Sequence, residues 1–123
     1  MKIKEAIRRV DALKYNTFSA GQKVLWLSML DSRVKKHIID THEGADAIIF
    51  TEYNEDTDLE TELLAEAPFD EMYLRWLEAQ IDLASRENAG YNDAYAQFEA
   101  VYKAYANYYN RTHMPIGERF KFF

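Results

Sequence analysis

Cysteine is absent from the 123 residues of the chain, and glycine and proline occur only four times and twice. The absence of cysteine excludes thiol catalysis, a disulfide framework and any zinc or iron–sulfur site built on cysteine. The four scattered glycines form no glycine-rich turn of the kind that cradles a phosphate group. We therefore expect a protein that folds in a reducing, intracellular compartment and lacks a phosphate-binding loop.

Lysine and arginine are missing from residues 37 to 74, a segment that holds 12 acidic residues. Residues 1 to 36 carry nine basic and three acidic residues, whereas residues 75 to 123 hold six of each. The net charge of −6 thus conceals a segregation of charge along the chain. Direct DNA binding is disfavoured, because phosphate recognition needs a clustered basic surface that this balance hardly supplies.

The acidic segment has two interpretations. It is either a solvated loop, which is the common case for runs of like charge, or one half of an electrostatic contact between copies of the chain. In the second case, basic residues of one subunit would face the acidic loop of another. The basic candidates are Arg8, Arg9, Arg33, Lys35 and Lys36, and the acidic candidates are Glu52, Glu55, Asp56, Asp58 and Glu60.

A long apolar run is also lacking. Charged residues at Lys2, Lys4 and Glu5 interrupt the only apolar stretch near the N-terminus. This pattern predicts neither a signal peptide nor a membrane-spanning helix. We expect the protein to remain where it is made and to bind no membrane.

Apolar residues recur at helical spacing in four segments. The first begins at Ile3 and ends near residues 15–16. The second follows a capping box, in which Ser19 precedes Gln22 by three positions, and extends until Gly44 offers a stop. The third has Pro68 in its first turn and stops near residues 88–90, and the fourth covers residues 91–109 with Asn88 or Asn92 as its cap.

Helical periodicity disappears between these second and third segments. Residues 47–53 are rich in β-branched and aromatic side chains, which favours a short strand or hairpin. The expected fold is an all-α bundle of about four helices with a small irregular or β-hairpin insertion between helices 2 and 3. We expect one domain over residues 1–123, with an acidic insertion loop at 45–67 and a C-terminal tail at 114–123.

Tests for catalytic and metal-binding patterns nominate no residue. His37 and His42 are five positions apart, which does not place two imidazoles on one helix face, and His113 is distant; surface histidines are expected. The acidic run at 56–62 lacks the glycine of a calcium loop, and Glu52-x-x-Glu55 lies in the irregular segment without a second acidic pair. We predict no catalytic residue, no cofactor and no metal.

Six aromatic residues form a seam along the fourth segment, at spacings of three and four. They are Tyr91, Tyr95, Phe98, Tyr102, Tyr105 and Tyr109. Aromatics at such spacing are usually core, but six of them hide on the order of 1,000 Å², about one partner's share of a protein interface. Tyrosine hydroxyls also suit a half-wet boundary. We expect part core and part subunit interface, with Tyr95, Tyr102, Tyr105 and Tyr109 at the contact.

The C-terminal tail alternates bulky aromatics with cations. Exposed phenylalanines at a chain end are costly, so we expect Phe120, Phe122 and Phe123 to dock into a groove. The groove could belong to the same subunit or to a neighbour.

The order of these features resembles the small head-to-tail connector (adaptor) proteins of tailed bacteriophages and prophages. The resemblance covers nearly the whole chain, and it rests on the order and spacing of weak motifs rather than on any one of them. The motifs are Asn16-Thr17-Phe18-Ser19, Lys23-Val24-Leu25-Trp26-Leu27-Ser28-Met29-Leu30-Asp31, Thr61-Glu62-Leu63-Leu64, Pro68-Phe69-Asp70-Glu71-Met72-Tyr73, Ala79-Gln80-Ile81-Asp82 and Tyr91-Asn92.

The resemblance implies a helical subunit of a ring of about a dozen copies. Such a ring lies beneath the portal, contacts tail or stopper proteins, and encloses the channel through which DNA passes without specific binding. It implies no enzymatic activity, and a location in the bacterial host cytoplasm during assembly and then at the head-to-tail junction of the virion. An acidic loop facing the channel would repel phosphate.

Two other functions remain open from the sequence. The main alternative is a cytoplasmic helical regulatory or antitoxin-like module from a mobile element, which would use the same surfaces on another protein. A magnesium-dependent helical nucleotide hydrolase is the third.

Overall fold

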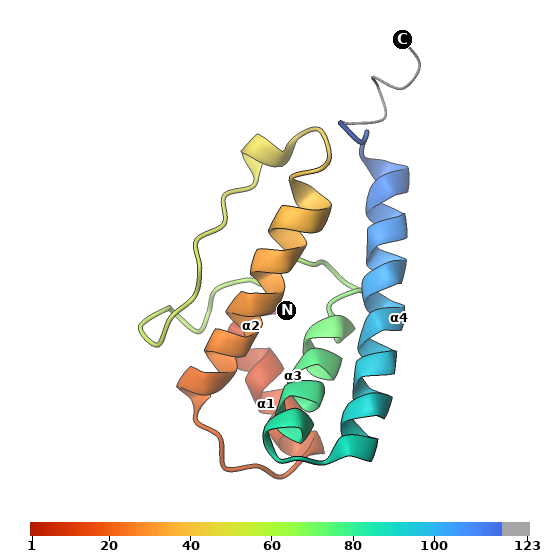
Figure 1. The fold of residues 1–123 in the computed structure, drawn as a ribbon. Coiled ribbons are helices and arrows are strands. Elements are labelled where there is room, and N and C mark those ends of the chain that lie inside the picture. Colours follow the sequence, from red (N-terminus) through yellow and green to blue (C-terminus); the bar gives the residue numbers. More distant parts are fainter. Residues whose placement is uncertain (117–123) are drawn as a thin grey trace.

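The structure, a computed structural model, describes residues 1–116, and four α-helices account for most of them (Figure 1). The helices are α1 (Ile3–Leu13), α2 (Ala20–Val34), α3 (Glu71–Ala84) and α4 (Asn88–Thr112). A π-helical turn, η1 (Lys35–Ile39), continues α2, and a short 3-10 turn, η2 (Ala45–Ala47), follows. No β-strand occurs in the described part of the chain. The predicted all-α fold of about four helices is confirmed.

The first two helices form in the segments where the apolar spacing predicted them, but both end early. Helix α1 ends at Leu13 rather than near residues 15–16, and α2 with η1 ends at Ile39 rather than at Gly44. In α1, Ile3, Ala6 and Val10 lie on one buried face. The Ser19 half of the predicted capping box is present, because the backbone N–H of Gln22 donates to Ser19 Oγ at 3.1 Å. This bond satisfies one of the N–H groups that a helix start leaves without an intrahelical partner.

Helices α3 and α4 run antiparallel and make the most extensive helix–helix contact (Figure 1). The ring centroids of Trp76 in α3 and Phe98 in α4 lie 5.1 Å apart. At the start of α4, Gly90 faces the side chain of Asp82, and a Cβ there would lie 2.8 Å from Asp82 Oδ2. Glycine is therefore what allows the two helices to approach closely at this end.

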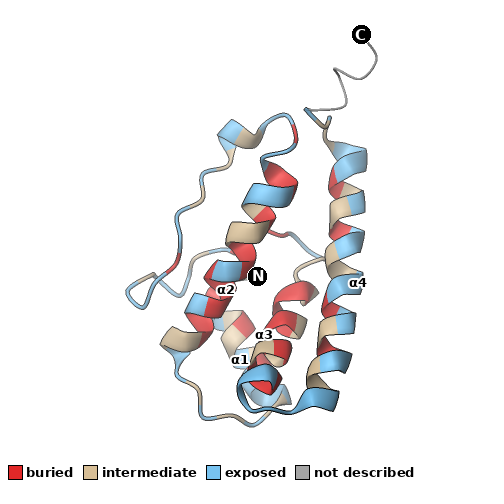
Figure 2. Cartoon of the chain, viewed as in Figure 1, coloured by how far each residue is buried: buried red, intermediate tan, exposed pale blue. Residues whose placement is uncertain are grey.

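The core is formed by the inward faces of the four helices, as the buried residues in Figure 2 show. Leu27, Met72, Leu77 and Phe98 are among its fully buried side chains. The insertion also contributes to the core, since Tyr53 and Leu63 belong to the same buried cluster. The long connection between α2 and α3 is therefore part of the packed subunit.

Helix α3 begins later than predicted. Pro68 was expected in the first helical turn, but α3 starts at Glu71 after a series of turns. The side chain of Phe69 in these turns packs against α4, with its ring centroid 4.9 Å from that of Tyr108. This tertiary contact holds residues 66–70 in turns before the helix starts.

Helix α4 is longer than predicted. It begins at Asn88 rather than Tyr91, and Glu87 precedes it without a side-chain capping hydrogen bond. Gly90 therefore lies inside the helix, where its lack of a side chain serves the contact with Asp82. The prediction took this glycine as a stop between two helices, which is its more common use.

The strand predicted at 47–53 is absent. Residues 48–53 are extended, but no neighbouring segment within residues 1–116 forms a ladder with them. The β-branched composition favours extended backbone, whereas a strand also needs a partner for its hydrogen bonds.

Candidate functional site

The acidic insertion is attached to the bundle by a buried carboxylate, Asp31 of α2, which is 0% exposed. Tyr53 Oη donates to Asp31 Oδ2 at 2.6 Å, and Tyr73 Oη of α3 donates to Asp31 Oδ1 at 2.6 Å. The backbone N–H of Leu64 donates to Oδ2 at 3.1 Å. The insertion has an outgoing limb, which contains Tyr53, and a returning limb, which contains Leu64. The side chain of Asp31 thus joins α2, α3 and both limbs.

Two further bonds complete this network. The backbone N–H of Ala65 donates to Tyr73 Oη at 2.7 Å, and that of Tyr53 donates to Ser28 Oγ at 2.9 Å. Buried polar groups are expensive unless they are paired, so a fully paired set fixes the backbone that carries it. The insertion is held in one place at residues 53 and 64–65.

Burial governs the protonation of this network. It raises the pKa of Asp31, although the three donated hydrogen bonds act to lower it. Burial, together with the charge of Asp31, also raises the pKa of Tyr53 and Tyr73. Both phenols therefore stay protonated as donors. Because both carboxylate oxygens already accept hydrogen bonds from the chain, the arrangement suits support of the insertion better than acid–base catalysis.

The second attachment of the insertion is to the N-terminal segment. Lys2 and Glu62 form an isolated antiparallel bridge, and the N–H groups of Ile3 and Lys4 each donate to a carbonyl of the insertion at 3.0 Å. The ammonium of Lys2 lies 2.8 Å from Glu60, and Lys4 also pairs with Glu60. These lysines lower the pKa of Glu60 to about 2.

The predicted basic partners lie in different surroundings. Arg9 binds Glu71 at 2.7 Å and Lys35 binds Asp40, so both form ion pairs within the subunit. Arg8 and Lys36 are exposed. Contact of these basic residues with the acidic loop of another copy stays a prediction, although Glu60 is already paired within its own chain.

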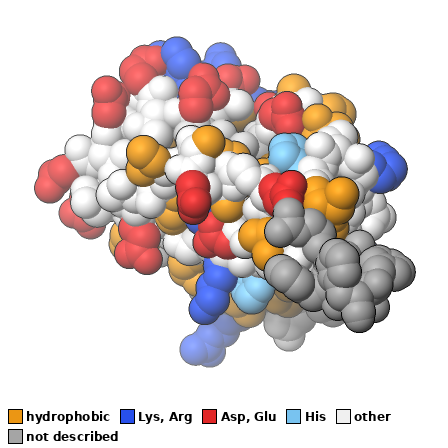
Figure 3. All heavy atoms as spheres, turned by 90° about the horizontal axis from the view of Figure 1, so that it is seen from above, with side chains coloured by type: hydrophobic (Ala, Val, Ile, Leu, Met, Phe, Trp, Pro, Cys, Tyr) orange, Lys and Arg blue, Asp and Glu red, His pale blue; other side chains and the backbone are white. Residues whose placement is uncertain are grey.

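Exposed carboxylates remain on the insertion. The predicted channel-facing residues Glu52, Glu55, Asp56 and Asp58 are all exposed. In the view from above, acidic side chains gather on the side where Figure 1 places the insertion (Figure 3). The result is an acidic surface on backbone that the Asp31 network holds in place.

The aromatic seam divides into a buried and a half-buried part. Phe98, Tyr105 and Tyr109 are buried, so Tyr105 and Tyr109, which were expected at a subunit contact, instead lie in the core of the subunit. Their neighbours in the core explain this, because both pack on residues that the sequence separates widely, Phe69 and His42. The contact role remains a prediction for the half-buried Tyr95 and Tyr102.

Arg33 lies against this half-buried part of the seam. Its guanidinium carbon is 4.4 Å from the ring centroid of Tyr102 and 5.9 Å from that of Phe98. A cation over an aromatic face is attractive, more so when water is excluded. Arg33 therefore links α2 to α4 within the subunit, and its role in a contact between copies stays a prediction.

His42 is buried, so its prediction as a surface histidine was wrong. Nδ1 lies 2.5 Å from the carbonyl oxygen of Ile38, and Nε2 lies 2.7 Å from Asn110 Oδ1. The ring also contacts Tyr109 edge to face, with centroids 4.9 Å apart. Spacing rules could not reveal this burial, because Asn110 lies 68 residues away in the sequence. Within residues 1–116, no group of three or more His, Cys, Asp or Glu side chains could hold a metal ion.

The tail residues Phe120, Phe122 and Phe123 lie outside the described residues. None of the helices within residues 1–116 combines the length and the apolar composition that crossing a membrane would require. Comparisons with protein-family models, curated proteins and solved structures found no match for the chain.

Proposed function

We propose that the chain is a structural subunit of a ring between the portal and the tail of a tailed phage or prophage. In this role it bridges head and tail around the DNA channel and contacts the portal and the tail or stopper proteins. It assembles in the bacterial host cytoplasm and then resides at the head-to-tail junction. The resemblance of the sequence motifs to connector proteins supports this proposal, and a helical bundle is the fold that the resemblance implies.

The observation that carries the proposal is the anchored acidic insertion. Exposed carboxylates at Glu52, Glu55, Asp56 and Asp58 project from a segment that Asp31 attaches to two helices. A channel wall for DNA needs negative charge, which repels phosphate, and it needs that charge in a defined place. A loop fixed at both limbs meets both requirements.

The proposed contact between subunits lies on the part of the aromatic seam of α4 that the core does not bury. Tyr95 and Tyr102 present half-buried rings beside Arg33 on the outer part of the α4 seam. Tyrosine and arginine are the residues that most often dominate the energy of protein interfaces. This patch is the proposed contact between neighbouring subunits.

Electron microscopy and native mass spectrometry of the chain with portal rings from the same genome test the proposal. A closed ring of about a dozen copies on the portal is expected. A chain that stays monomeric and ignores the portal contradicts the connector function. A ring whose insertion faces outward contradicts the channel assignment alone.

Neutralising the loop gives a second test. The double variant Glu52→Gln/Asp56→Asn should still form rings, but these rings should retain DNA at low salt because the channel repels phosphate less. The matched control is Asp93→Asn/Glu99→Gln, which removes two exposed charges of α4. Equal DNA retention by both variants would show that the loop does not line the channel.

A further inference from the structure

Residues 48–53 form a drawn-out segment beside α2 that belongs to no helix or strand (Figure 1). The backbone N–H groups of residues 49–52 donate to no acceptor within residues 1–116, whereas those of Ile48 and Tyr53 are bonded. Extended backbone with free N–H and C=O groups is a template on which another chain can add a strand.

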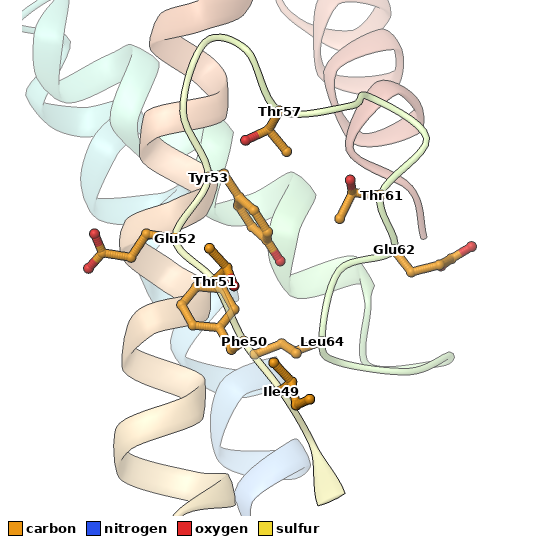
Figure 4. A pocket seen from close by; sticks show the side chains of 9 residues that line it. All are labelled: Ile49, Phe50, Thr51, Glu52, Tyr53, Thr57, Thr61, Glu62 and Leu64. Carbon is orange, nitrogen blue, oxygen red and sulfur yellow. The ribbon is translucent and has the colours of Figure 1, made fainter.

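A hollow of about 310 Å³ lies beside this segment, between it and the returning limb of the insertion (Figure 4). Apolar side chains of Ile49, Phe50 and Leu64 lie together at one end, and Ile49 is 88% exposed. Glu52 and Glu62 point outward from the two opposite limbs. The hollow therefore suits an occupant with apolar side chains and a positive charge.

The C-terminal residues of the chain have that chemistry. The sequence Arg119-Phe120-Lys121-Phe122-Phe123 alternates cations with aromatics as far as Phe122, so an extended strand puts Phe120 and Phe122 on the face opposite Arg119 and Lys121. Its two cations complement the insertion, where residues 48–64 hold six carboxylates and no basic residue. Phenylalanine also has a high preference for strands.

We propose that residues 119–123 of one copy add a β-strand to residues 49–52 of a neighbouring copy. Phe120 and Phe122 enter the hollow beside Ile49, and Arg119 and Lys121 face the carboxylates of Glu52 and Glu62. The inference rests on the proposed function, in which copies stand side by side in a ring. Residues 119–123 and residues 49–52 then form a contact between neighbouring copies of the ring.

The last described residues are hydrogen-bonded to residues 41–43, which follow η1. The N–H of Ile116 donates to the carbonyl of Thr41 at 2.9 Å, and Pro115 forms an antiparallel bridge with His42. At Pro115 the chain therefore runs antiparallel to the segment around His42.

The absence of cysteine allows a direct test by cross-linking of full-length chains. Chains with Ile49→Cys are mixed with chains that carry Phe122→Cys and a larger tag, with and without portal rings, and treated with a short bismaleimide. At least about tenfold more mixed dimer is expected than with Leu83→Cys in place of Ile49→Cys, because pairing raises the local concentration. Leu83 is a suitable control since it is 53% exposed on α3.

Two outcomes overturn the inference. Mixed dimer at the level of the Leu83→Cys control, while rings form on the portal, rejects the tail contact and leaves the connector function standing. Efficient cross-linking only within one chain, in the Ile49→Cys/Phe122→Cys double variant, shows that the tail occupies its own subunit. Mixed dimer without any ring supports the strand pairing and contradicts the connector function instead.

Discussion

Asp31 is the residue on which the position of the insertion depends. Its hydrogen-bond partners lie 22, 33 and 42 residues away, so no local pattern could reveal them. The signal in the sequence was an acidic residue among Leu27, Leu30 and Val34, the buried stripe of α2. An isolated carboxylate on an apolar helix face calls for buried donors, but it does not identify them.

Replacing Tyr53 by phenylalanine should weaken this attachment. The Tyr53→Phe variant loses the hydroxyl that donates to Asp31 and leaves a buried carboxylate with fewer donors. We expect the free energy of unfolding in urea to fall by about 1–3 kcal/mol. Tyr15→Phe, at a residue 90% exposed, is the control and should change nothing. Equal stability of Tyr53→Phe and the parent chain would show that the network contributes little.

Glu60 should make stability depend on pH in the acid range. Hydrogen bonds from Lys2 and Lys4 lower its pKa from 4.5 to about 2 in the folded chain. A lowered pKa means that the folded chain holds the charged form more strongly than the unfolded chain does. The contribution of Glu60 to the stability of the fold is therefore complete above pH 4.5 and is lost as the pH falls through about 2.

The variant Glu60→Gln tests this dependence. It should have a lower melting temperature than the parent chain at neutral pH, and the difference should shrink with acidification and with added salt, because the pairs are exposed. Glu99→Gln, at an exposed position of α4, controls for the loss of one surface charge. A difference that grows as the pH falls would have the wrong sign for this explanation.

At the scale of elements, periodicity predicted the helices but not all their ends. The signal for the N-cap at Ser19 was local, and the cap was correctly placed. The starts of α3 and α4 depended instead on Phe69 packing against Tyr108 and on Gly90 facing Asp82. No short window of sequence contains both Phe69 and Tyr108, and the contact of Gly90 with Asp82 becomes apparent only once α3 and α4 are packed together.

Gly90 should resist substitution even though alanine is the better helix former. Alanine would favour the helix by about 1 kcal/mol, but its Cβ would lie 2.8 Å from Asp82 Oδ2. Asp82 cannot easily move, since it is 2% exposed and bound by Lys14 at 2.7 Å. We expect Gly90→Ala to destabilise the fold by roughly 1 kcal/mol in urea titrations.

Gly21 supplies the matched comparison for this prediction. A Cβ at Gly21 would lie 3.0 Å from Glu55 Cγ, in an exposed side chain that can turn away. Gly21→Ala should therefore be neutral or stabilise by up to about 1 kcal/mol. Similar effects of both substitutions would mean that the approach of α3 to α4 is not limited by Gly90.

At the scale of the whole molecule, the charge segregation of the sequence is partly resolved within one subunit. Lys2 and Lys4 pair with Glu60, and Arg9 pairs with Glu71. The sequence could identify the basic and acidic segments, yet charge counts do not say whether opposite charges meet in one copy or between copies. Exposure of Glu52 and Asp56 leaves part of the acidic surface available to a partner.

The Asp31 network also has a consequence for the order in which the subunit folds. Its donors come from α3 and from both limbs of the insertion, so the network can close only after α2 and α3 have come together. Interactions that form after the transition state affect unfolding rates and leave folding rates nearly unchanged.

Stopped-flow kinetics in urea should show this order. We expect Tyr53→Phe to speed unfolding about 5- to 150-fold, in line with a loss of about 1–3 kcal/mol, and to leave the refolding rate nearly the same. Slower refolding with unchanged unfolding would place the network in the folding nucleus. The insertion is then the last part of the subunit to close and the first to open, and it can detach while the four helices stay packed.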